Sequence, residues 1–179
     1  MDVAEAIRLK RAVRSFAAEP VSDEDVHAIL SAGRRAQSSK NTQPWQFIAI
    51  RDRSTLETLA GFGTYAGHLA GAGLGVVIAT ADPAPPVSLH RGGERWSILF
   101  DAGQAASYMQ LVAWERGIGS CLATIYEPEK ARRLLGVPDD VHLNVALSFG
   151  HPEDPSVLTS APRTGGRRPL NDMVHWERW

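Results

Sequence analysis

Four cationic residues stand close together near the start of the chain: Arg8, Lys10, Arg11 and Arg14. On a helix, Lys10 and Arg14 lie one turn apart with Arg11 beside them. Such a group binds a phosphate through charge-assisted hydrogen bonds. A solvated helix end explains the same residues, because cations also favour the C-terminal end of the helix dipole. From the cluster alone, we prefer the solvated helix end.

A polar loop at residues 37–44 is a second candidate site. It contains Ser38, Ser39 and Asn41, and it precedes a strand-like segment that begins at Trp45. Hydroxyl and amide groups of this kind can hydrogen-bond a polar ring or a phosphate. Ordinary turn chemistry explains them equally well. A third group, Arg163, Arg167 and Arg168, either binds a phosphate or keeps the end of the chain soluble.

Several other kinds of site are excluded by spacing. The glycine-rich run at residues 61–75 precedes a predicted strand, whereas a dinucleotide-binding fingerprint must follow a strand and open a helix. The sequence contains no G-x-S-x-G, no H-E-x-x-H and no P-loop. The six histidines show no metal-ligand spacing, so we expect no metal site. Cys121 lies in an apolar predicted strand and is interpreted as buried and inert.

Composition limits the class of protein. The chain has 179 residues, 44% of them hydrophobic, which is enough for one domain with a real core. Nineteen Lys and Arg against 20 Asp and Glu give no support for nucleic-acid binding. A single cysteine is typical of the reducing cytoplasm. The N-terminus resembles no secretory signal, and the most apolar stretch, residues 74–81, is too short to span a membrane. We therefore expect a soluble, cytoplasmic, single-domain protein.

Helical and strand-like patterns alternate along the chain. We expect a first helix that carries residues 3–10 and ends before the Glu19-Pro20 turn. We expect further helices at residues 23–36 after a Ser22 cap, 54–59 after a Ser54 cap, 93–116, and from residue 128 onward. We expect strands at residues 45–50, 74–80, 121–126 and 141–149. The apolar stripe of the longest helix consists mostly of small residues, so another helix could approach it closely: Ile98, Ala102, Ala105, Met109 and Val112. The irregular end, from residue 151, is unusual unless it is functional or packs on a partner.

Taken together, these segments resemble the nitroreductase family of flavin enzymes over nearly the whole chain. Residues 10–16 (KRAVRSF) look like the family's first motif, and residues 38–45 (SSKNTQPW) are the most specific match. Residues 117–121 (GIGSC) resemble the segment leading into the flavin loop. Pro169-Leu170 and Val174-His175 resemble the closing tail.

The resemblance implies an α+β fold with a central, mainly antiparallel sheet flanked by helices. It also implies one domain over residues 1–179 and a homodimer, with the long helix in the interface and residues 150–179 wrapping the other subunit. FMN would lie at the interface. The implied FMN contacts are Lys10, Arg11, Ala12 and Arg14 in the first motif; Ser38, Ser39 and Asn41 from the opposite subunit; Leu122, Ala123 and the backbone N–H of Thr124; and Arg167 and Arg168 at the phosphate.

The resemblance further implies ping-pong chemistry. NADH or NADPH passes a hydride to the flavin, and a nitroaromatic, quinone or similar electron-poor small molecule then takes the electrons in the same place. The chemistry belongs mostly to the cofactor. No side chain is named as a general acid, and Arg14 is expected to stabilise the reduced flavin electrostatically.

The chain also departs from the family pattern. Lys10 stands where an arginine is usual, Ala12 where a serine is usual, and Gln37 where a proline is common. His68 lies where the family often supplies amide or lysine contacts; we interpret it as a solvated loop histidine, with a ribityl or substrate contact as the alternative.

Two other functions stay open. One is a same-fold flavin enzyme with another redox task, either reductive dehalogenation or oxygen-dependent flavin breakdown. Such relatives tend to carry a substrate lid, whereas the short, proline-containing stretch at residues 82–93 favours an open site. The other is a non-catalytic flavin-binding dimer, which Lys10 and Ala12 keep open.

Overall fold

The computed structural model describes residues 1–81, 93–161 and 166–179. The predicted short, open loop after residue 81 and the side chain of Arg163 lie outside these residues. No helix in the described ranges is long and apolar enough to cross a membrane.

A four-stranded sheet forms the centre of the molecule. Its strands are β1 (Trp45–Ile50), β2 (Leu74–Ala81), β3 (Gly119–Thr124) and β4 (Val141–Gly150). They pair in the order β1-β2-β4-β3, and every pair is antiparallel. β2 is buried on both faces, as its continuous apolar run predicts. The antiparallel sheet confirms the fold class inferred from the sequence.

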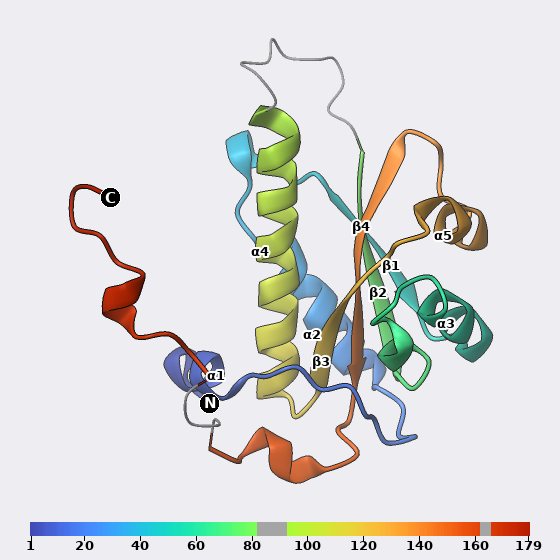
Figure 1. Cartoon of the computed structure of the whole chain (residues 1–179). Helices are drawn as coiled ribbons and strands as arrows, with labels where there is room; N and C mark the ends of the chain where they lie inside the picture. Colours follow the sequence, from blue (N-terminus) through green and yellow to red (C-terminus); the bar gives the residue numbers. More distant parts are fainter. Residues whose placement is uncertain (82–92, 162–165) are drawn as a thin grey trace.

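Helices cover both faces of this sheet (Figure 1). One face carries α2 (Asp23–Arg34) and the long α4 (Gly93–Glu115). The other face carries α3 (Arg53–Ala60), α5 (Pro128–Leu135) and the 3-10 turn η2 (Gly67–Leu69). The pattern follows from the strands, because alternate side chains of β4 enter two separate apolar clusters.

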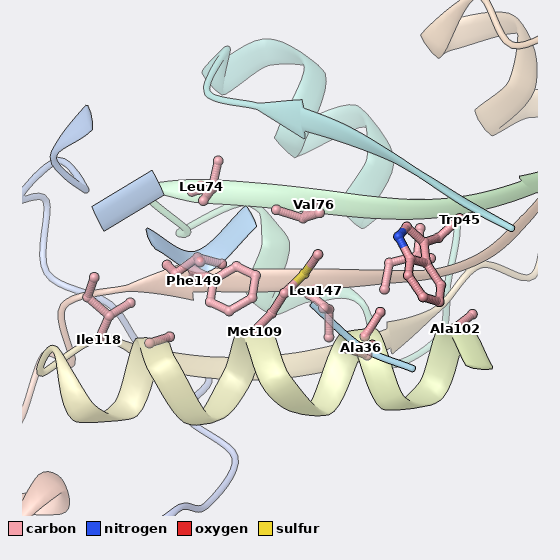
Figure 2. Close-up of a cluster of buried hydrophobic side chains, with 14 of the residues drawn as sticks. Ala36, Trp45, Leu74, Val76, Ala102, Met109, Ile118, Leu147 and Phe149 are labelled. Carbon is pink, nitrogen blue, oxygen red and sulfur yellow. The ribbon is translucent and has the colours of Figure 1, made fainter. Parts of the chain in front are cut away.

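The larger cluster lies between α4 and the sheet, where Met109 and Ile118 face Leu147 and Phe149 (Figure 2). α2 packs closely on α4, because a Cβ at Gly33 would collide with Met109. The small-residue stripe of α4 therefore admits another helix, as predicted. Its Ala102, Ala105 and Met109 are buried within the chain and pack on the chain's own core, and a subunit interface on the long helix stays a prediction.

Of the two predicted helix caps, the cap of α2 is confirmed and the cap of α3 is wrong. Ser22 caps α2 by accepting the Asp25 N–H at 3.1 Å, as expected. α3 begins after Asp52, whose carboxylate accepts the Thr55 N–H at 2.7 Å and the Ser54 hydroxyl at 2.6 Å. These hydrogen bonds to the charged form lower the pKa of Asp52 to about 2. Ser54 is a donor to the cap and not the cap itself.

α1 (Val3–Leu9) ends earlier than the cationic motif requires. The chain beyond it runs beside the free edge of β3, where Val13 donates its N–H to the Ser120 carbonyl at 2.9 Å. A Cβ at Gly119 would lie 2.7 Å from Val13, so a side chain there would force the two segments apart. The predicted helical spacing of Lys10, Arg11 and Arg14 is therefore wrong, because a sheet edge supplies backbone partners that a helix would have used.

Candidate functional site

Three of the predicted phosphate ligands line one cavity. Lys10 and Arg11 meet Arg167 of the tail around a space of about 490 Å³. Ile7, Arg8, Leu9 and Gly166 complete its walls. Side chains that are more than 150 positions apart in sequence thus form one cationic pocket, referred to below as the cationic cavity. Its charge suits an anion such as a phosphate.

The cations of this cavity differ in what they already bind. Arg11 donates to the Leu9 carbonyl at 3.2 Å and to the Ser160 carbonyl at 2.5 Å, so it anchors the tail. Lys10 is half-buried and forms no ion pair with any described residue. Burial lowers the pKa of Lys10, and the neighbouring Cys121 thiol opposes this effect. A bound anion would supply the partner that the Lys10 ammonium lacks.

Arg14 and Ala12 lie on the strand-like segment beside β3. Both are exposed, and Arg14 forms no hydrogen bond or ion pair within the described part of the chain. Arg14 borders a second cavity of about 380 Å³ that also contains Glu153 and Asp154, so this space is less favourable for an anion. Arg168 does not reach the cationic cavity in this structure and donates to the Asp172 carbonyl at 2.9 Å.

β3 presents only part of its predicted contact surface. Leu122 is 47% exposed and Thr124 is exposed on the same face, whereas the Ala123 side chain lies in the core. Ala123 could therefore meet a ring only through its backbone. Gly63 makes room for the end of this strand, because a Cβ there would collide with the Thr124 carbonyl.

The loop at residues 38–43 is held in a strained conformation. Lys40, Asn41 and Gln43 have φ of 52°, 56° and 48°, values that are unfavourable for residues with side chains. Two contacts fix the loop. The Ser39 N–H donates to the buried carboxylate of Asp101 at 2.9 Å, and the Gln43 N–H donates to Ser38 Oγ at 2.9 Å.

This loop and the cationic cavity lie toward opposite ends of α4. The loop is tied to Asp101, whereas Leu9 and Val13 pack on Trp114. Asp101 and Trp114 are thirteen positions apart, or about 20 Å along the helix axis. Figure 1 shows the same separation, with α1 near the C-terminal end of α4. One chain therefore does not bring Ser38, Ser39 and Asn41 to Lys10, Arg11 and Arg14.

Large apolar side chains remain exposed on the single chain. Leu99 and Tyr108 lie on the outer side of α4, and Val3 and Ile7 lie on α1. The tail carries Leu170, Met173, Trp176 and Trp179, of which Trp176 is 81% exposed. From residue 168 onward, the hydrogen bonds of the described tail are internal, and Figure 1 shows the tail running away from the body. Exposed apolar surface of this extent marks an interaction site.

The structure contradicts the interpretation of His68 as a solvated loop histidine. Its side chain is only 8% exposed, and Nδ1 lies 2.8 Å from Ser148 Oγ on β4. η2 turns the ring beneath the sheet, where burial and the positive charge of Arg14 lower the pKa of His68.

The sequence analysis did not identify Asp101 as the residue that holds the loop at residues 38–43, although one sequence signal was available. Asp101 adjoins the apolar stripe of α4, and a carboxylate beside such a stripe needs a buried partner.

Comparisons with known proteins agree with this geometry. The sequence matches the family model described as the nitroreductase family over residues 7–62 and 63–151. It is 31% identical over 177 residues to a candidate NADH dehydrogenase/NAD(P)H nitroreductase of Archaeoglobus fulgidus, covering 97% of this chain and 96% of that protein. It is 26% identical over 197 residues to a 5,6-dimethylbenzimidazole synthase of Rhodobacter capsulatus, covering 97% and 94%. The solved structure of an FMN-dependent nitroreductase from Clostridium difficile superposes with a TM-score of 0.82, at 26% identity, covering 99% of this chain and 100% of that one.

Proposed function

This chain belongs to the nitroreductase family of NAD(P)H-dependent flavin oxidoreductases, and from that premise we propose that it binds FMN and reduces nitroaromatic, quinone or similar electron-poor compounds. The observation that carries the proposal is the cationic cavity, where Lys10, Arg11 and Arg167 meet. A phosphate and an adjoining planar ring would both find suitable partners there.

The residues present fit FMN. Lys10, Arg11 and Arg167 would hold the phosphate, and a bound phosphate would pair the half-buried Lys10 ammonium. Leu122 would exclude water from one side of the ring, and Thr124 would offer its backbone N–H. When bound, FMN supplies hydride chemistry that amino-acid side chains cannot perform. Arg14 would place a positive charge where negative charge develops on reduction.

We further propose that the site is completed by a second copy of the chain. The separation of the loop from the cationic cavity supports this, because Ser38, Ser39 and Asn41 can reach such a site only from another subunit. The exposed apolar residues of α4 and of the tail supply the surface that a homodimer would bury. In that arrangement residues 1–179 act as one unit, and residues 150–179 wrap the partner.

The chemistry we propose is ping-pong. Leu122 and Thr124 form an open surface, so NADH or NADPH and the electron acceptor can use the same space in turn. No side chain needs to act as a nucleophile. We also propose the reducing cytoplasm as the compartment, because the sequence has a single cysteine.

The first experiment is an absorption spectrum of the purified protein with added FMN, taken after gel filtration. Retained flavin that bleaches anaerobically with NADH or NADPH, and regains its colour with benzoquinone or nitrobenzene, would support the proposed reductase. Protein that retains no flavin would overturn the cofactor assignment. Retained flavin that neither nicotinamide reduces would indicate a non-catalytic flavin-binding dimer.

A second candidate is oxygen-dependent breakdown of the flavin. The similarity to a 5,6-dimethylbenzimidazole synthase over 97% of the chain favours it. Aerobic incubation of the protein with reduced FMN distinguishes the two functions. Loss of the isoalloxazine ring and appearance of a benzimidazole product would favour breakdown, whereas intact, reoxidised FMN would favour the reductase.

A further inference from the structure

A cavity of about 580 Å³ opens between α2 and the edge strand β1, and the proposed reductase mechanism makes no use of it. Its walls come from one face of α2 and from residues 43–47, which lead into β1 and include its start. None of its lining residues borders the cationic cavity. A volume of this size is typical of small-molecule sites. We refer to this space as the α2–β1 cavity.

The helical wall of this cavity follows from the spacing of its residues. His27, Leu30, Ser31 and Arg34 lie three or four positions apart along α2, or next to one another, so their side chains share one face of the helix. Ile29 lies on another face and is fully buried in the core. α2 therefore packs on the body through one side and presents the other side to the α2–β1 cavity.

The opposite wall is aromatic. Trp45 and Phe47 alternate along β1, so their side chains lie on the same face of the strand. Their ring centroids are 6.5 Å apart and the ring planes differ by only 5°. Trp45 also packs in the core cluster that contains Ala36 and Ala102 (Figure 2), whereas Phe47 is half-buried. Aromatic side chains of this kind offer a large contact area to another planar ring.

One positive charge borders this aromatic wall without a partner. Arg34 is exposed and forms no hydrogen bond or ion pair within the described part of the chain. The acidic side chains at the start of α2 are already paired, Asp23 with Arg51 and Asp25 with Arg116. No carboxylate of the described residues lines the α2–β1 cavity. An anion placed against Arg34 would therefore meet no like charge in the cavity wall.

The composition of the walls indicates which kind of anion fits. The cationic cavity gathers several cations, which suits a multiply charged phosphate. The α2–β1 cavity instead combines one guanidinium, from Arg34, with the neutral hydroxyl of Ser31 and an aromatic surface. The planar fork of a guanidinium matches the two oxygens of a carboxylate. A singly charged acid that carries a planar ring would use both walls.

We propose that the α2–β1 cavity binds a small aromatic carboxylate, with its ring against Trp45 and Phe47 and its carboxylate on the Arg34 guanidinium. The proposal does not depend on FMN binding, because the two cavities share no residue. Arg34 also lies in the last turn of α2, where the helix dipole favours a cation. Arg35, the next residue, would serve the dipole equally but does not line the cavity. The two arginines therefore separate ligand binding from helix stabilisation.

Isothermal titration calorimetry of the full-length protein with 1-naphthoate tests the proposal. We expect saturable binding of one naphthoate per chain. Arg34→Gln should weaken this binding by at least about 10-fold, because hydrogen bonds between two charged groups are lost. Arg35→Gln is the matched control and should leave the affinity unchanged. An equal loss in both variants would show that only net charge matters and would overturn the proposal. The absence of saturable binding, as expected if a second copy of the chain covered this face, would also overturn it.

Two further titrations identify the ligand chemistry and the place of binding. 1-Naphthamide has the same ring without the charge and should bind at least about 10-fold more weakly than 1-naphthoate. Equal affinities would overturn recognition of the carboxylate. Lys10→Met alters only the cationic cavity and should bind 1-naphthoate as the wild type does. A loss as large as that in Arg34→Gln would place the probe in the cationic cavity and would overturn the assignment to the α2–β1 cavity.

Discussion

The cationic cavity and the loop at residues 38–43 are both candidate parts of one site, but they are built differently. At the cavity, Lys10 has no ion-pair partner among the described residues, so the chain leaves charge available to a ligand. At the loop, Ser38 and Ser39 already use polar groups to hold a strained backbone. The cationic cavity has positive charge without a partner, whereas the polar groups that hold the loop are already paired and keep its backbone rigid.

This difference indicates how the site is divided. A region with unpaired cations supplies affinity for an anion. A rigid region is preorganised, so a ligand that contacts it loses less free energy in ordering the loop. The two are separated by about 20 Å of α4, estimated from its rise per residue. A second copy of the chain would place its own rigid loop beside the cationic cavity of the first copy.

Replacing Arg14 with Glu should have the largest effect. It removes an exposed cation and adds a repelling charge, so we expect FMN affinity to fall by about 100-fold, toward the upper end of what the loss of one hydrogen bond to a charged group costs. Isothermal titration calorimetry would measure the affinity. Arg133→Glu makes the same change at an exposed position on α5 and should leave it unaltered. A similar loss in both variants would mean that only net charge matters.

Mixed dimers should restore half of the sites. In a dimer of Arg14→Glu with Asp101→Ala, one of the two sites receives intact cations from one subunit and an intact loop from the other. We expect one FMN of wild-type affinity per mixed dimer, measured by flavin fluorescence after tandem-tag purification. A dimer of wild type with the double variant is the matched control, because each of its sites carries one defect. If each site instead lies within one subunit, the pattern reverses, and only the dimer of wild type with the double variant keeps one FMN of wild-type affinity.

Asp101→Ala should weaken FMN binding about 10-fold although Asp101 lies far from the cationic cavity of its own chain. Losing the carboxylate leaves the Ser39 N–H without its acceptor, which costs about 1 to 3 kcal/mol and lets the strained loop relax. Titration calorimetry and urea unfolding would measure both effects. Glu115→Ala removes an exposed carboxylate from the same helix and should change neither.

Lys10→Met should separate stability from binding. Burial lowers the pKa of Lys10, so the folded chain disfavours its charge at neutral pH, and an apolar side chain should raise the Tm of the FMN-free protein. The same change should lower FMN affinity about 5-fold, because one of the cavity's cations is lost. Lys130→Met, at an exposed pair with Glu127, serves as the control. A fall in Tm would show that the ammonium has a partner in solution.

His68→Asn should alter the pH dependence of stability only slightly, and only at pH values below about 6.5. The folded pKa of His68 lies below its ordinary value of 6.5, so as pH falls through 6.5 the unfolded chain binds a proton that the folded chain does not. The wild type should therefore lose stability as pH falls from that point toward the folded pKa, and the variant should lose less. Thermal melts at several pH values, with His27→Asn as reference, would reveal the difference. Parallel curves would contradict a buried neutral ring.

Much of the fold follows from local sequence patterns. The strand at Trp45–Ile50 and the Ser22 cap were predicted correctly, because alternation and capping depend on neighbouring residues. The errors occur where distant groups compete. Lys10, Arg11 and Arg14 are not helical because the edge of β3 binds that backbone, and Asp52 replaces Ser54 because a carboxylate accepts more hydrogen bonds than a hydroxyl can.

The sequence by itself determined the family, the four strands, the long helix and the residues able to bind an anion, since each of these depends on residue type and short spacing. Only the tertiary structure decided that Arg167 lies against Lys10, that Asp101 holds the loop, and that His68 is buried against Ser148. Burial and the pairing of distant polar groups are properties of the packed chain, and no local pattern specifies them.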